Sequence, residues 1–175
     1  RYLTDFNYDG TVTFKYKAGS VLLQKHIALV QNENTVAIAY SISNAGPQAF
    51  LRITPLMNFR EHSSSSTRDS LQLCTQKNEY GGFTLTPAAN PDIQIVLSCS
   101  KSTLIKRKHV YDEDMQYQTE VDNESPGLDC HYCPYDISVT IPSKSTVQFS
   151  IVCSVVKKGD NFLHPVTADG AHKLV

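Results

Sequence analysis

Apolar residues recur at every second position in several runs of this sequence, and this period of two limits the fold more than any other feature. The alternation is clearest in 36–42, 93–99 and 147–155, and the second of these runs reads "IQIVLSC". Side chains of a β-strand point alternately to opposite faces, so each run is predicted to be a strand with one core face. Turn-forming clusters such as "QNENT", "NAGPQ" and "IPSKS" separate the runs. The pattern predicts an all-β, antiparallel β-sandwich with little or no helix.

Three segments need a separate interpretation. The stretch "VLLQKHIALV" (21–30) has helical alternatives, but it is short, lacks caps and lies between strands, so we predict a strand. The stretch "FLRITPLM" (50–57) is predicted to be a buried strand. The acidic segment 111–129, "YDEDMQYQTEVDNESPGLD", breaks the strand pattern and is expected to be a long loop or excursion. Long loops on a rigid sandwich are often functional.

Length and charge exclude several classes of protein. A chain of 175 residues has the length of one domain, so we expect a single sandwich over 1–175. Lys plus Arg is 16 and Asp plus Glu is 17, a balance that argues against nucleic-acid binding. The longest apolar runs are too short to span a membrane, so no membrane association is expected. The chain opens "RYLTDFNYDG", without Met or a signal-peptide pattern, and is expected to be a fragment of a longer protein.

The cysteines indicate reduced thiols and a cytoplasmic location. Their odd number and apolar surroundings fit free thiols better than a disulfide framework. Cys130 and Cys133, in "CHYCP", have redox or zinc spacing, but a strand pattern follows and there is no second CxxC. His131 or Cys74 remains an alternative further ligand. We expect two reduced thiols in a loop, with no metal and no cofactor. The five residues are Cys74, Cys99, Cys130, Cys133 and Cys153.

A run of acids is a candidate source of a general acid. Asp112, Glu113 and Asp114 include a possible general acid, although acids in a loop are more often merely solvated. Glycoside hydrolysis requires two carboxylates that face each other across the substrate. No catalytic residue is assigned to this chain.

The segment "NFREHSSSS" carries the most suggestive polar row. In an extended segment Asn58, Arg60 and His62 project from one face, whereas Phe59 and Glu61 point the other way. Asn supplies a donor and an acceptor, Arg a fixed fork of donors, and His either. Such a row suits sugar hydroxyls or a carboxylate on a partner domain. We expect Arg60 to be the anchor, with paired hydrogen bonds to that ligand.

The alternative interpretation is structural. In this view Arg60 and Glu61, with Arg68 and Asp69, form surface ion pairs at a strand end. Such pairs contribute only about 0–1 kcal/mol.

A longer stretch resembles a known family. The segment "NENTVAIAYSISNAGPQAFLRITPLMNFREHSSSS" is similar to the N-terminal domain of microbial glycogen debranching enzymes of the amylo-α-1,6-glucosidase type. The segment "YQTEVDNESPGLDCHYCPYDISVTIPSKSTVQFSI" is also similar, in its acidic excursion and the strands after it. The family's histidine stands one place earlier here, at His62. The positions that match the family's pattern are Asn34, Thr35, Val36, Tyr40, Leu56, Asn58, Arg60 and Glu61.

The resemblance implies an accessory domain rather than a catalytic one. In the family, a large sandwich of the supersandwich type precedes an (α/α) barrel, which carries the catalytic carboxylates and hydrolyses α-1,6 branch glucosides. This chain would then dock on the C-terminal barrel of the same polypeptide. Its row at Asn58, Arg60, Glu61 and His62 would face the barrel, or glycogen or another branched glucan at its mouth.

Two other functions stay open at this point. A free-standing carbohydrate-binding module would present exposed rings, and four tyrosines lie in or beside the acidic excursion. A structural sandwich without a ligand is the third possibility. The tyrosines are Tyr111, Tyr117, Tyr132 and Tyr135.

Overall fold

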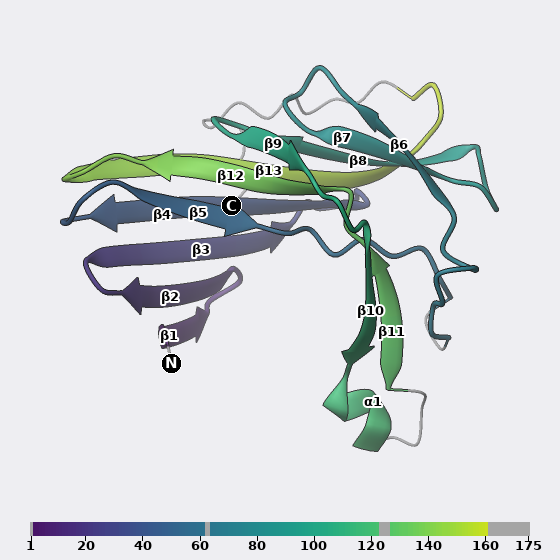
Figure 1. Ribbon diagram of the computed structural model, residues 1–175, viewed down its shortest axis with the longest axis horizontal. Helices are drawn as coiled ribbons and strands as arrows, with labels where there is room; N and C mark the ends of the chain where they lie inside the picture. The colour runs from purple at the N-terminus through teal and green to yellow at the C-terminus, as the bar shows by residue number, and fades with distance from the viewer. Residues whose placement is uncertain (1, 62–63, 123–126, 161–175) are drawn as a thin grey trace.

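The computed structural model describes residues 2–61, 64–122 and 127–160, and strands make up most of this part of the chain (Figure 1). Eight antiparallel strands form the largest sheet, in the order β1-β2-β3-β4-β13-β8-β7-β6. The long strand near its centre pairs over ten residues with one neighbour and over seven with the other. The bounds are Leu3–Tyr8 (β1), Val12–Ala18 (β2), Val21–Leu29 (β3), Thr35–Asn44 (β4), Leu73–Lys77 (β6), Phe83–Pro87 (β7), Ile93–Cys99 (β8) and Ser145–Lys157 (β13).

A second, three-stranded sheet lies over the middle of the first and encloses the core. Its order is β5-β12-β9, with bounds Ala49–Ile53, Tyr135–Ile141 and Thr103–Lys106. Ile137 and Val139 of β12 are fully buried in one cluster with Tyr40 and Phe149 of the large sheet. The rings of Tyr40 and Phe149 stack with centroids 4.6 Å apart. The predicted all-β antiparallel sandwich is therefore confirmed.

Two strand predictions have different outcomes. The segment predicted as a strand in 21–30 is β3, because its two neighbours in the sheet satisfy its backbone groups. The segment "FLRITPLM" is only in part a strand, since β5 ends at Ile53, and it is half-buried rather than buried. Phe50 is 67% exposed because it lies on the outer face of β5, whereas Leu51 and Ile53 on the other face pack against the core. Pro55 has no backbone N–H and cannot continue a ladder.

The acidic segment is an excursion, as predicted, but it is a regular hairpin rather than an irregular loop. Tyr111 pairs with Tyr132 and Asp112 with His131, after which the register shifts before Met115. Asp114 lies within this bulge with a φ of 63°. A bulge bends and twists a ribbon, and the hairpin projects away from the sandwich (Figure 1). The bounds are Tyr111–Gln116 (β10), Gln118–Asp122 (α1) and Leu128–Tyr132 (β11).

Candidate interface at the root of the hairpin

The segment "NFREHSSSS" leaves the sandwich along the free edge of β11. Met57 and Tyr132 exchange backbone hydrogen bonds of 3.1 and 2.9 Å, which form an isolated bridge. The Cys130 N–H donates to the Ser66 carbonyl at 3.1 Å further along the same edge. The segment therefore holds the root of the hairpin from the side opposite β10.

A buried carboxylate joins the two segments. The Asp129 side chain is 1% exposed, and one of its oxygens accepts from Asn58 Nδ2 at 3.0 Å and Arg60 Nε at 2.9 Å. The other oxygen accepts from the backbone N–H of Ser66 at 2.7 Å and of Cys130 at 3.0 Å. Four donors thus satisfy this carboxylate, which is how a charge is accommodated inside a protein.

The remaining polar atoms of this cluster are also paired. The Ser66 hydroxyl donates to Asn58 Oδ1 at 2.6 Å, and Asn58 Oδ1 also accepts from the Phe59 N–H at 2.8 Å. Arg60 Nη1 donates to the Glu61 carbonyl at 3.2 Å and to the carbonyl of Ser64. We call Asn58, Arg60, Ser66 and Asp129 the Asp129 cluster. It makes part of the serine run a structural element rather than a solvated turn.

The predicted row is partly reproduced. Asn58 and Arg60 point to one acceptor, so they share a side as expected, but that acceptor is Asp129 of the same chain. Phe59 and Glu61 do not point the same way as predicted, because Glu61 is exposed whereas Phe59 packs against the core. His62 lies outside the described residues. An outward role for these residues stays a prediction.

The two arginines of the structural alternative pair with acids that are distant in sequence. Arg60 pairs with Asp129, 69 positions away, rather than with its neighbour Glu61. Arg68 lies 3.9 Å from Glu113 of the hairpin and 5.0 Å from the ring centre of Tyr111. No local pattern marks Asp129, because its donors come from a segment that is distant in sequence.

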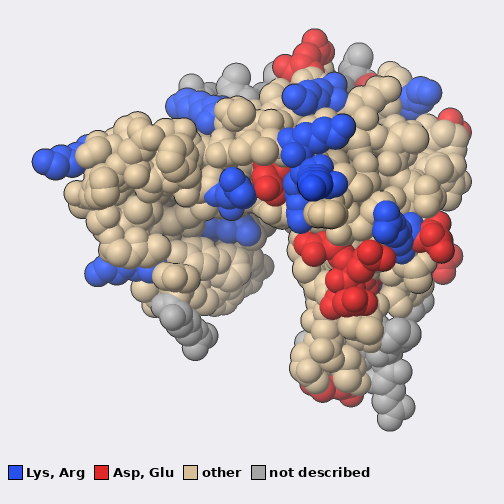
Figure 2. All heavy atoms as spheres, viewed as in Figure 1, with Lys and Arg blue, Asp and Glu red and all other residues tan. Residues whose placement is uncertain are grey.

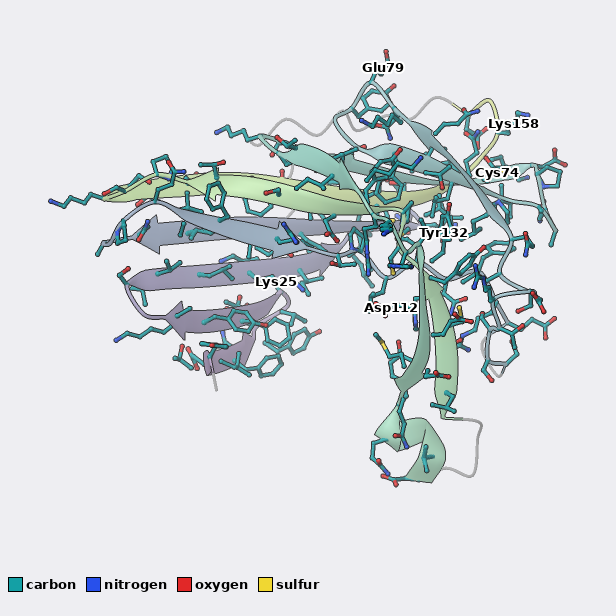
Figure 3. All side chains as sticks on the ribbon, viewed as in Figure 1. Lys25, Cys74, Glu79, Asp112, Tyr132 and Lys158 are labelled. Atoms are coloured by element: carbon teal, nitrogen blue, oxygen red, sulfur yellow. The ribbon has the colours of Figure 1, made fainter. Side chains whose placement is uncertain are left out.

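The acids at the hairpin root lie beside basic residues, as Figure 2 shows. Arg107 Nη1 is 3.9 Å from the Asp112 carboxylate, which Figure 3 labels at this point. A pocket of about 220 Å³ lies beside the Asp129 cluster. Its lining residues are Ser65, Ser66, Thr67, Arg68, Glu113, Asp114, Leu128, Asp129 and Cys130.

The two cysteines of "CHYCP" are free, buried thiols, but the predicted loop is wrong for Cys130, which lies within β11, whereas Cys133 follows the end of that strand. Burial raises the pKa of the Cys133 thiol to about 11, and burial followed by the nearby Glu113 and Asp129 charges raises that of Cys130. Between the two cysteines lies the buried His131, whose Nε2 shares a hydrogen bond of 3.0 Å with the Tyr117 hydroxyl. Within the described ranges, no three His, Cys, Asp or Glu side chains are grouped as metal ligands would be.

The tyrosines of the excursion pack within the chain. The rings of Tyr111 and Tyr132 meet edge to face at 5.3 Å, and Tyr135 lies 5.4 Å from Phe83. The Tyr117 ring contacts His131 at 5.9 Å. These rings therefore do not form the open platform that a carbohydrate-binding module needs. In the part of the chain that the structure describes, no helix has the length and apolar character of a membrane span.

No curated protein sequence matches the chain. Among solved structures, one titled heparinase III has a TM-score of 0.43 and 12% sequence identity to this chain. The matched region includes 88% of this chain and 21% of the heparinase III chain. A putative kojibiose phosphorylase from human microbiome has a TM-score of 0.38 and 8% identity, over 94% of this chain and 20% of its own.

The chain thus spans about a fifth of each of these two proteins. The family comparison is more specific, since the model described as "Glycogen debranching enzyme N terminal" matches residues 1–148. That match covers most of the sandwich, the Asp129 cluster and the hairpin, so this chain belongs to the glycogen debranching enzyme N-terminal family.

Proposed function

We propose that residues 1–175 form a single, non-catalytic β-sandwich domain of a cytoplasmic glycogen-debranching α-1,6-glucosidase. The domain docks on the C-terminal catalytic barrel of the same polypeptide and contacts glycogen or another branched glucan there. The observation that carries this proposal is the family match over residues 1–148. In this proposal the domain needs no cofactor of its own.

The Asp129 cluster supports a positioning role in that assembly. Asn58 and Arg60 hold Asp129, and Asp129 in turn fixes the root of the projecting hairpin. Glu61 is exposed on the same segment, and in this proposal Glu61 and His62 form the interface with the barrel or its glucan. In this scheme Arg60 acts through Asp129 as well as on the surface.

A catalytic role is assigned to the barrel because hydrolysis needs a positioned pair of carboxylates. The acids nearest to such a role here, Asp112 and Glu113, lie beside Arg107 and Arg68. We therefore expect the chain by itself to release no glucose from a branched dextrin. Saturable release that is lost on Asp112→Asn or Glu113→Gln would contradict this assignment.

The interface is tested in the full-length enzyme with Glu61→Lys. A reversed charge within an interface costs several kcal/mol, so kcat/KM for α-1,6 branch hydrolysis falls by about tenfold or more. Glu79→Lys is the matched control, because Glu79 is exposed on a turn that Figure 3 places away from the hairpin. Both activities are expressed per folded molecule, from circular dichroism. Equal activity of the two variants would exclude Glu61 from the interface.

A further inference from the structure

The three N-terminal strands of the large sheet extend beyond the smaller sheet, which leaves one of their faces open (Figure 1). Residues directly opposite each other in antiparallel strands share a face. Phe6 pairs with Phe14, Phe14 with Lys25, and Lys25 with Tyr40 of the buried core. The open face is therefore the continuation of the face that the core covers elsewhere.

This face has the composition of a core rather than of a surface. We call it the β1–β3 face. Phe6 and Tyr8 are 56% and 69% exposed on β1, and the Phe6 and Phe14 rings lie 5.1 Å apart. Its members are Phe6, Tyr8, Val12, Phe14, Tyr16, Val21, Leu23, Lys25, Ile27 and Leu29.

The opposite face of the same strands is polar, as a solvent-facing side is expected to be. Lys15 pairs with Asp5 there at 2.9 Å, and the Thr13 hydroxyl lies 3.0 Å from His26 Nδ1. The contrast matters because apolar side chains alternate with polar ones only where one face is to be buried.

Lys25 is the one charged residue of the β1–β3 face, and Figure 3 shows it next to the rings of β1 and β2. Its ammonium lies 6.0 Å from the ring centre of Phe14, and burial lowers its pKa. Among the described residues, no Asp or Glu forms an ion pair with it. A half-buried ammonium on an apolar face is complementary to a carboxylate that arrives with a covering surface.

We propose that the β1–β3 face is a docking surface for another part of the same polypeptide, an apolar protein surface that carries an Asp or Glu opposite Lys25. A glucan fits less well, because sugar recognition needs several polar groups around the rings and this face offers few. The proposal rests on the chain being part of a longer enzyme, and it names a surface separate from the Asp129 cluster.

Hydroxyl-radical footprinting of the full-length enzyme tests the docking. Leu29 and Leu22 form a matched pair, because both lie on β3, on opposite faces, and are 81% and 52% exposed in this chain. Without a covering surface Leu29 is oxidised faster than Leu22. With one, Leu29 is oxidised about fivefold more slowly than Leu22, since the centre of an interface excludes water. Oxidation of Leu29 at least as fast as that of Leu22 would overturn the proposal.

A charge reversal tests the carboxylate. Lys25→Glu exposes Leu29 to oxidation again, whereas Lys15→Glu on the polar face leaves the pattern unchanged. Protection that survives Lys25→Glu refutes the opposed carboxylate. Protection that disappears on dilution identifies a second copy, and protection that requires added glycogen identifies a glucan; either result overturns the proposal. An enzyme that protects Leu29 but cleaves no α-1,6 branch refutes the proposed function alone.

Discussion

Replacement of Asp129 by asparagine removes the charge from the centre of the hairpin root with almost no change in shape. In the native chain each carboxylate oxygen accepts two hydrogen bonds, one pair from side chains and one pair from backbone N–H groups. An asparagine amide has one oxygen and one NH₂ group, so two of the four donors face a donor in either orientation. Arg60 also loses its buried counter-ion.

The expected loss of stability is large for a single substitution. Hydrogen bonds to charged groups contribute about 1.5–3 kcal/mol each, and removal of one partner of a buried ion pair costs about 3–5 kcal/mol. We take about 3–5 kcal/mol for Asp129→Asn. In a domain of this length that lowers Tm by roughly 10–15 °C.

Urea unfolding followed by far-UV circular dichroism measures this loss, because the chain has no Trp to report by fluorescence. Asp112→Asn is the matched control, since its carboxylate is half exposed on the same hairpin and lies 3.9 Å from Arg107. Exposed pairs contribute about 0–1 kcal/mol, so the control stays close to the native chain. Arg60→Ala falls between the two, at about 1.5–3 kcal/mol.

If Asp129→Asn unfolds within about 0.5 kcal/mol of the native chain, the range typical of neutral surface changes, the cluster does not hold the hairpin root. A loss confined to Arg60→Ala would instead assign the stability to Arg60 contacts other than Asp129.

Three further predictions follow from packing. Gly82→Ala places a Cβ against the Leu97 carbonyl oxygen, closer than two atoms can approach, so we expect a loss of about 3 kcal/mol by urea unfolding, and native-like stability would contradict this contact. Phe149→Ala removes the ring that stacks on Tyr40 in the core and should cost about 3–5 kcal/mol; a cost below about 1 kcal/mol would show that the core closes around the gap. At pH 8 a thiol reagent should modify Cys74 rapidly and Cys153 slowly, because burial raises the pKa of Cys153 to about 11; two equally fast thiols would refute this.

Metal content remains to be measured as a separate prediction. We expect the purified chain to carry no zinc at its cysteines, since one CxxC supplies two of the four ligands of a structural site. About one zinc per chain by elemental analysis would overturn that expectation.

The local sequence pattern by itself determined which segments of this protein form strands and which family the chain resembles. Alternation is a property of neighbouring residues, so 36–42, 93–99 and 147–155 could be assigned to β4, β8 and β13 without knowledge of their partners. Alternation within an extended segment likewise predicted that Asn58 and Arg60 lie on one side.

Tertiary structure alone decided what those faces and side chains meet. Asp129 became the acceptor of Arg60 because the hairpin brings β11 beside a segment 69 positions earlier, and no periodicity encodes that distance. Pairing likewise turned the acidic segment into a hairpin, since a strand that looks irregular alone is stabilised by the neighbour that accepts its hydrogen bonds. The open β1–β3 face depends on how far the smaller sheet reaches, which is set by the packing of whole sheets.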